Sequence, residues 1–218
     1  MVDPRQKNIS IWEDIYNSHE SNLSYPDENL VRISHRLFQK ETHAKILDYG
    51  FGSGSNLIHL AQKGFELHGV EISETAIRNL KDKLSKMDMP AHLHSIRDKK
   101  IPYEDQFFDV VVAWQVLYYN DWSSLEMAIK EIDRILRPGG IFLGTMGAIG
   151  DFSHRHSNPL GDSIFESTVP GQEGAIVMIV EQDQLYRCFK NKNITIGKFG
   201  FEYDDRQSHH WVISYVKE

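Results

Sequence analysis

Hydrophobic and polar positions alternate in blocks through the middle of the chain. Short runs of β-branched and aromatic residues, each long enough for one strand, are followed by segments with apolar residues at helical spacing. The runs predict five strands, at 44–49, 65–71, 91–96, 107–113 and 141–146. Since strands that alternate with helices are joined by right-handed crossovers, this pattern predicts a parallel sheet with helices on both faces.

Capping residues and helix breakers mark the helices between these strands. A helix is expected over 56–62, and a second begins after the cap residue Ser73. A third begins at the capping box of Ser123 and Glu126 and ends before the sequence PGG at 138–140. Each of these helices therefore connects two consecutive strands.

The C-terminal third of the chain follows a different pattern. Extended runs at 194–203 and 209–216 are separated by a short polar segment that leaves no room for a helix, so they predict an antiparallel hairpin at the sheet edge. A short helix is expected over 183–189. The stretch at about 147–180 begins with many glycine and polar residues and is interpreted as an irregular insertion.

The N-terminal region has helical patterning without strands. Ser10 and Glu13 form a capping box that predicts a short helix, and a second amphipathic helix is expected after Pro26. The predicted organisation is therefore a pair of N-terminal helices in residues 1–43, followed by one α/β domain in residues 44–218.

Composition and net charge restrict the classes of molecule that the protein is expected to bind. The 218 residues are 40% hydrophobic and 25% charged, as in an ordinary globular chain, and the formal charge is −7. This negative balance argues against nucleic acid or an anionic membrane as partner. The start, MVDPRQKNIS, lacks an apolar core, so no signal peptide is expected, and no apolar run is long enough for a bilayer. The single cysteine, Cys188, fits a reducing compartment, and a cytoplasmic location is expected.

A glycine-rich turn is the most informative feature. Gly50, Gly52 and Gly54 lie between a buried strand and a helix, where glycine lets the backbone turn sharply and approach a ligand closely. Glu71 ends the second strand, where a carboxylate can accept hydrogen bonds from two ribose hydroxyls. A dinucleotide fingerprint would place its third glycine or an alanine at 55, which is Ser55. The third glycine is Gly54 instead, so the spacing is G-x-G-x-G and differs from the dinucleotide fingerprint.

This region resembles the class I S-adenosylmethionine-dependent methyltransferases, with a domain of the methyltransferase type 11/12 kind. Their first motif, a strand ending in an acid and then G-x-G-x-G, is matched by DYGFGSG at 48–54. The resemblance continues with Glu71, with IPYED and FDVV in 101–111, and with LRPGG at 136–140, and it covers about two thirds of the chain. It implies an α/β fold: a doubly wound, seven-stranded, mostly parallel, Rossmann-like sheet with an antiparallel C-terminal edge hairpin and helices on both faces.

The resemblance also implies a cofactor, S-adenosyl-L-methionine, with S-adenosyl-L-homocysteine as product. The three glycines would lie under its methionine and ribose parts, Glu71 would hold the ribose, and Ile72 would pack on the adenine. Arg97 or Ile96, with Asp98, would meet the adenine amino group. The implied cofactor-binding residues are Asp48, Gly50, Phe51, Gly52, Gly54, Glu71, Ile72, Arg97, Asp98 and Trp114. The Phe51 side chain is expected to point away from the ligand.

The residues that would bind the methyl acceptor are less clearly indicated by the sequence. In relatives the first helix often covers the cofactor as a lid, which would give Trp12 and Tyr16 a role in the lid or at the substrate; the alternative is packing that holds the helix down. Weak catalytic candidates are Tyr118, Tyr119 and His154. A metal site is not predicted, because the His-x-His pair ending at His156 lies in a loop and the rings of His209 and His210 should alternate to opposite faces.

The leading hypothesis is an enzyme, a methyltransferase that moves a methyl group to a small-molecule acceptor by in-line displacement. A general base is needed only where the acceptor must lose a proton. One alternative is an NAD(P)-dependent oxidoreductase, against which Ser55 and the absence of an evident Tyr-x-x-x-Lys pair argue. The other alternative is a non-catalytic S-adenosylmethionine-binding protein, which the lack of a clear base in the sequence leaves open.

Overall fold

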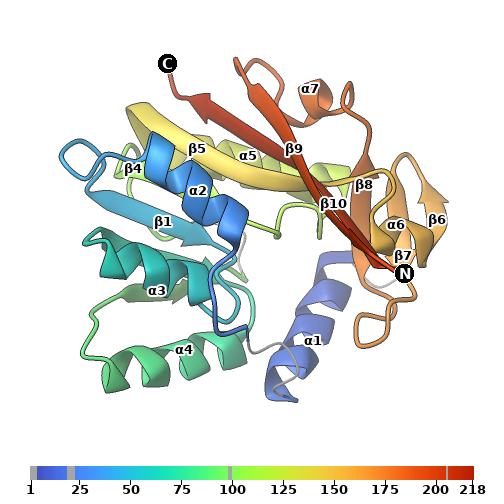
Figure 1. The fold of residues 1–218 in the computed structure, drawn as a ribbon, viewed down its shortest axis with the longest axis horizontal. Helices are drawn as coiled ribbons and strands as arrows, with labels where there is room; N and C mark the ends of the chain where they lie inside the picture. The colour runs from blue at the N-terminus through green and yellow to red at the C-terminus, as the bar shows by residue number, and fades with distance from the viewer. Residues whose placement is uncertain (1–3, 19–22, 98–99, 205) are drawn as a thin grey trace.

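A computed structural model of the chain describes residues 4–18, 23–97, 100–204 and 206–218. Its centre is a parallel sheet with the strand order β3-β2-β1-β4-β5, in which β1 pairs with β2 and with β4 (Figure 1). Every residue of β4 is buried, as expected for a central strand covered on both faces. The bounds are β1 Lys45–Tyr49, β2 Glu66–Glu71, β3 His92–Ser95, β4 Phe108–Ala113 and β5 Leu136–Ala148.

The predicted C-terminal hairpin is confirmed. It consists of β9, Thr195–Tyr203, and β10, Arg206–Val216, which pair antiparallel. β10 also pairs antiparallel with β5, with Ile213 opposite Gly144, so the hairpin extends the parallel sheet beyond β5. This reversal completes the mostly parallel α/β sheet expected from the sequence.

Helices cover both faces of this sheet. Apolar residues of α2, α3 and α4 form one hydrophobic core with one face, and those of α5 and α7 form a second core with the other face. The N-terminal helix α1 lies apart from these layers, beside the loops at one end of the sheet (Figure 1). The bounds are α1 Pro4–Asn17, α2 Glu28–Leu37, α3 Ser55–Gln62, α4 Glu74–Lys86, α5 Trp122–Ile135 and α7 Leu185–Cys188.

The segment expected to be irregular is ordered, which corrects the prediction for 147–180 and raises the sheet of the described residues from seven strands to ten. β8 pairs parallel with the last residues of β5, and its five residues are all buried. The prediction failed because strands this short are stabilised by distant partners, which local composition does not reveal. The elements are α6 Phe152–Arg155, β6 Ser157–Gly161, β7 Ile164–Ser167 and β8 Ile176–Val180.

Two helix starts also differ from the sequence prediction. α1 begins at Pro4, so Ser10 lies inside the helix and does not cap it. Asp121 caps α5 in place of Ser123, because its carboxylate Oδ1 accepts the backbone N–H of Ser124 at 2.7 Å. An aspartate two residues earlier therefore takes the capping function that the Ser123 pattern indicated.

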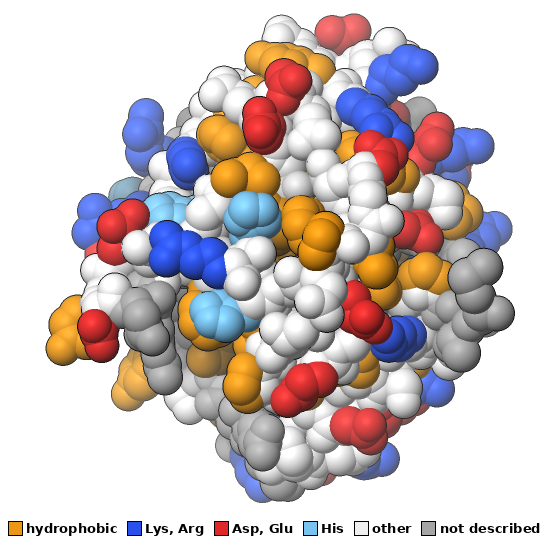
Figure 2. Space-filling model, turned by 90° about the vertical axis from the view of Figure 1, so that its right-hand side faces the viewer, with side chains coloured by type: hydrophobic (Ala, Val, Ile, Leu, Met, Phe, Trp, Pro, Cys, Tyr) orange, Lys and Arg blue, Asp and Glu red, His pale blue; other side chains and the backbone are white. Residues whose placement is uncertain are grey.

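The surface carries mixed charge. On the face shown in Figure 2, acidic and basic side chains are interspersed and do not separate into one large basic patch. In the ranges that the structure describes, no helix combines the length and the apolar character needed to cross a bilayer.

Asn8 anchors α1 to the rest of the molecule. Its amide Nδ2 donates to the carbonyl oxygens of Tyr119 and Ile176, both at 2.9 Å, and its Oδ1 accepts the N–H of Ile176 at 2.8 Å. Glu13, further along the same helix, accepts the backbone N–H and the hydroxyl of Thr75 at 3.2 and 2.7 Å. These polar contacts hold α1 against the loop after β4, against β8 and against the start of α4.

Replacing Asn8 with alanine should lower the free energy of unfolding by about 1–3 kcal/mol, because it leaves buried backbone groups without partners. Urea denaturation monitored by circular dichroism measures the loss. Ser10→Ala is the matched control, since Ser10 is exposed on the same helix and should change stability little. Equal stability of the Asn8 variant and the wild type would contradict the anchoring role.

Candidate functional site

The turn between β1 and α3 has a backbone that only glycine adopts easily. Gly50 and Gly52 have φ angles of +74° and +53°, in the left-handed region. Their surroundings leave no room for a side chain: a Cβ on Gly50 would overlap Val116, and a Cβ on Gly52 would lie 2.5 Å from the Tyr16 hydroxyl oxygen. The turn is therefore closely covered by the loop after β4 and by α1.

Glu71 joins the end of β2 to this turn. Its carboxylate accepts the backbone N–H groups of Gly52 at 2.9 Å, Ile72 at 2.7 Å and Ser73 at 3.1 Å. Burial raises the pKa of Glu71, and the three N–H donors oppose that rise. Oε1 accepts two of these N–H groups, whereas Oε2 accepts only that of Gly52, so Oε2 keeps capacity for a further hydrogen bond from a ligand.

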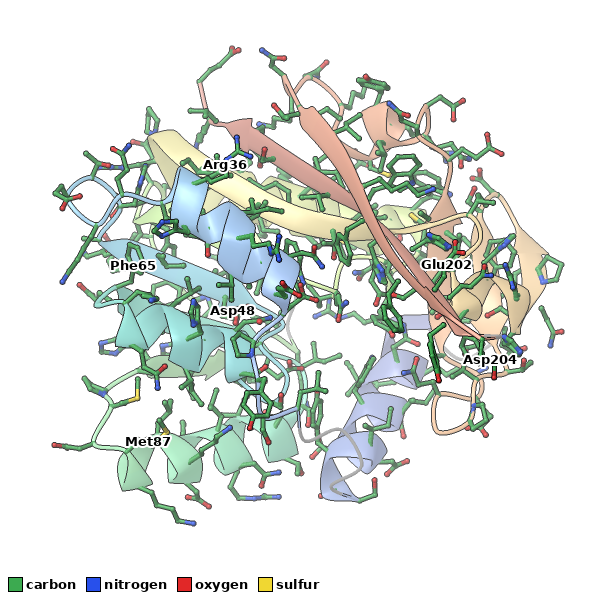
Figure 3. The ribbon with its side chains drawn as sticks, in the orientation of Figure 1. Arg36, Asp48, Phe65, Met87, Glu202 and Asp204 are labelled. Carbon is green, nitrogen blue, oxygen red and sulfur yellow. The ribbon has the colours of Figure 1, made fainter. Side chains whose placement is uncertain are left out.

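Asp48 is a second buried acid beside the turn, at the end of β1 where the chain runs toward α3 (Figure 3). Its oxygen Oδ2 has no hydrogen-bond partner within the described part of the chain. Burial raises the pKa of Asp48 to about 7, and the negative charge of Glu71 adds to the effect. A buried, ionised carboxylate oxygen without a partner is costly, which is why the folded protein favours the protonated form of Asp48.

Two cavities meet at the glycine turn. The first is lined by the ends of β1 and β2, including Glu71 and Ile72, by Ile96 after β3, and by Trp12 and Tyr16 of α1. A pocket with apolar walls and a few convergent polar groups is typical of a small-molecule site. It lies at the carboxyl ends of parallel strands, the edge at which open α/β sheets bind ligands.

The second cavity shares Trp12, Tyr16 and Gly50 with the first and extends toward β10 and the segment that follows β7. Aromatic rings form much of its wall; the Trp12 ring meets that of Tyr119 edge to face at 4.8 Å. The polar groups that also line it include Gln115, Asp151, Gln172, Ser208 and His210. The arrangement provides one cavity beside Glu71 and an adjoining one suited to a second molecule.

Most residues singled out in the sequence lie at these cavities. Tyr118 and Tyr119 line the second cavity, and the Tyr119 hydroxyl donates to Gln172 Oε1 at 3.1 Å. Trp114 also lines the second cavity, where its ring stacks on that of Phe199 with centroids 5.7 Å apart. The Phe51 ring is buried in the core formed with α3 and α4.

Other candidates lie elsewhere. Arg97 is exposed, and its Nε donates to the carbonyl oxygen of Ile72 at 3.0 Å. His154 lines neither cavity; its ring meets that of Phe165 edge to face at 5.3 Å. The ring of His156 stacks on Phe152. Asp98 lies outside the described residues.

His210 lines the second cavity but was not proposed as a site residue from the sequence. It is buried on β10, and its Nε2 lies 3.4 Å from the Tyr118 hydroxyl oxygen. The expected alternation of the two neighbouring histidines is confirmed, because His209 contacts Glu202 and not the cavity. The signal that could have found His210 is the alternation itself, combined with the pairing of β10 with β5.

Comparison with known proteins identifies the central part of the chain. Residues 46–140 match the family described as methyltransferase domain. A sterol 4-C-methyltransferase of Caenorhabditis elegans is 33% identical over 99 residues, which cover 44% of this chain and 29% of that protein. The match therefore spans less than a third of that relative's length.

Solved structures agree in fold. A protein of Methanosarcina mazei described as a SAM-dependent methyltransferase has a TM-score of 0.71 and 22% identity, covering 85% of this chain and 96% of that one. A 1,6-didemethyltoxoflavin-N1-methyltransferase of Burkholderia thailandensis, solved with S-adenosylhomocysteine, has a TM-score of 0.74 and 13% identity. The match covers 100% of this chain and 91% of that one. At these identities the likeness establishes the fold alone.

The raised pKa of Asp48 predicts how stability depends on pH. Between pH 4 and 7 the unfolded chain releases this proton while the folded chain keeps it, so rising pH disfavours folding, by up to about 4 kcal/mol above pH 7. Asp48→Asn should remove this loss and stabilise the protein at pH 8 more than at pH 4. Urea unfolding across this pH range measures it, with the exposed Asp82→Asn as control. An unchanged pH dependence in the Asp48 variant would refute the assignment.

Because Tyr16 lies against the glycine turn, a side chain added at Gly52 should lower the free energy of unfolding. Gly52→Ala combines left-handed strain, about 1–2 kcal/mol, with the contact to Tyr16. Gly139→Ala is the matched control, because Gly139 has a φ of +76° and a Cβ added there would meet nothing within 4 Å. Gly52→Ala should lower the free energy of unfolding more than Gly139→Ala does, and Tyr16→Phe should reduce the difference. Equal losses would show that α1 does not cover the turn.

Proposed function

The chain belongs to the class I S-adenosylmethionine-dependent methyltransferases, and on this premise we propose that it transfers the methyl group of that cofactor to a small-molecule acceptor. The observation that carries the proposal is the pair of buried carboxylates, Asp48 and Glu71, beside the glycine turn. They lie at the carboxyl ends of β1 and β2, two neighbouring parallel strands. The activity and the acceptor are proposals that go beyond family membership.

The residues present fit the cofactor. Glu71 would accept hydrogen bonds from the ribose hydroxyls, and Ile72 and Ile96 would pack beside the adenine, since all three line the first cavity. Asp48 lines neither cavity, so its buried carboxyl group would support the turn from inside the protein and would not touch the cofactor. Gly50 and Gly52 would let the backbone approach the ligand closely.

When bound, the cofactor supplies a methyl group activated by a sulfonium, so the main task of the protein is to align an acceptor for in-line attack. The second cavity adjoins the first at Gly50, Trp12 and Tyr16, which would place an acceptor next to the cofactor. α1 and the residues at 169–172 line this cavity, which supports a small acceptor. The formal charge of −7 and the mixed charge in Figure 2 support an acceptor other than nucleic acid.

The first test is binding and turnover. Isothermal titration of the purified chain with S-adenosylhomocysteine measures cofactor binding, and mass spectrometry of reactions with S-adenosylmethionine and a panel of small phenols, amines and thiols measures methyl transfer. We expect micromolar or tighter binding and a methylated product. A chain that binds the cofactor but methylates nothing in the panel would favour the alternative of a non-catalytic binding protein.

Glu71→Gln should weaken S-adenosylhomocysteine binding at least tenfold, about 1.4 kcal/mol. The amide has a single oxygen to accept from both the turn and the ribose, and its NH₂ group would face a backbone donor. Glu66→Gln is the matched control, because Glu66 is exposed at the opposite end of the same strand. Isothermal titration of both variants compares the affinities, and equal binding by the Glu71 variant and the control would contradict the assigned role.

A further inference from the structure

We infer that His210 accepts the proton of the methyl acceptor, and that this acceptor is an uncharged aromatic molecule carrying an acidic O–H or N–H group. The inference rests on the proposed methyl transfer and adds to it the proton-accepting residue and the acceptor class. It stands on three observations: the position of His210 in the second cavity, the polar groups around its ring, and the side chains that line the cavity.

The His210 ring is fixed in the wall of the second cavity. It is 5% exposed, and it stacks on Phe199 with centroids 5.3 Å apart and planes 11° apart. Its Nδ1 lies 3.3 Å from the Ser208 hydroxyl oxygen, and its Nε2 lies 3.4 Å from the Tyr118 hydroxyl oxygen. Both distances exceed those of well-formed hydrogen bonds, so the nitrogens can bind a ligand more tightly than they bind these hydroxyls.

Burial keeps the His210 ring neutral at neutral pH. Burial lowers the pKa of His210; the negative charges of Asp151 and Asp27 oppose this, and His209 adds to it. Asp151 already accepts the backbone N–H groups of Ser153 at 2.8 Å and His209 at 2.9 Å. A neutral imidazole with its proton on Nδ1, directed at Ser208, carries a lone pair on Nε2 that can accept a proton.

The other polar groups of the cavity suit this task less well. Burial raises the pKa of Tyr118 well above its usual range, so its hydroxyl stays protonated and serves as a hydrogen-bond donor. The Asp151 carboxylate accepts one backbone N–H group on each oxygen, and these contacts hold it against α6 and β10. His210 is therefore the group in the described cavity wall that is both neutral and able to take a proton.

The cavity wall also indicates the acceptor class. Among the described residues that line the second cavity there is no lysine or arginine, and the one carboxylate is Asp151. An acceptor with a carboxylate or phosphate would be buried without a compensating cation, which is costly. The rings of Trp12, Tyr16, Trp114 and Phe152 instead offer faces and edges on which a flat, uncharged aromatic molecule can pack.

The proposed methyl transfer forms one bond, breaks one bond and moves one proton. A lone pair of the acceptor oxygen or nitrogen forms the bond to the methyl carbon, and the bond from that carbon to sulfur breaks with its electron pair left on sulfur. The proton of the acceptor passes to Nε2 of His210. It leaves from the imidazolium to solvent after the product departs, which restores the neutral ring.

The first test follows the ionisation of a probe, 4-nitrophenol, bound to the protein with saturating S-adenosylhomocysteine. The absorbance of the phenolate gives the apparent pKa of the bound probe in wild type, His210→Gln and His209→Gln. The last variant is the matched control, because His209 is the neighbouring imidazole directed away from the cavity. We expect the pKa of the bound probe to be about one unit lower in wild type and control than in His210→Gln, a tenfold difference in ionisation.

The comparator 4-nitrobenzoate, which has the same ring with a carboxylate, should bind at least tenfold more weakly than 4-nitrophenol. The inference is overturned if the probe does not bind, if its pKa is the same in all three proteins, or if 4-nitrobenzoate binds as well. Failure of S-adenosylhomocysteine itself to bind, measured separately by isothermal titration, would instead overturn the proposed function.

The second test is the pH profile of methyl transfer from S-adenosylmethionine to 4-nitrophenol. In wild type and His209→Gln, kcat/KM should rise with pH through an apparent pKa below the usual value for histidine. His210→Gln should lack this rise and lose about 100-fold in kcat/KM. His210→Phe, which keeps the stacking on Phe199, should lose as much. A rise retained in either His210 variant, or no turnover of the probe by wild type with cofactor bound, would overturn the inference.

Discussion

The hydrogen bonds from three backbone N–H groups to the Glu71 carboxylate organise the site. They connect two segments that are distant in sequence, the turn at Gly52 and the start of α4 at Ile72 and Ser73. One buried acid thus links the glycine turn to the end of β2, and both cavities are lined by Gly50 of that turn. The donors offset the cost of burying the charge, and the acceptor capacity left on Oε2 is available to the proposed cofactor.

Much of the fold was predictable because its signals are local. The buried strands β1, β2 and β4, the cap Ser73 of α4 and the C-terminal hairpin follow from periodicity, capping and turn residues, and the glycine turn with Glu71 indicated the cofactor side. β6, β7 and β8 were not predicted, because they are stabilised by pairing with one another and with the far end of β5.

The acceptor side was predicted least well for the same reason. Tyr118 and Tyr119 were named from their position after β4, but His210 enters the cavity only because β10 pairs with β5 in a register that sets it opposite Gly147. His154, a weak catalytic candidate in the stretch after β5, lies on α6 against Phe165 and lines neither cavity. The missing hydrogen-bond partner of Asp48 likewise depends on surroundings that a strand pattern does not describe.

The docking of α1 has a kinetic consequence. Asn8 and Glu13 bind α1 to three different parts of the molecule. Two aromatic residues of the same helix, Trp12 and Tyr16, line the cavity beside Glu71. Under the proposed function, detachment of this helix would open the side of the recess that Trp12 and Tyr16 line. The dwell time of a spent cofactor in the proposed reaction would then depend on the strength of the few polar contacts that Asn8 and Glu13 make.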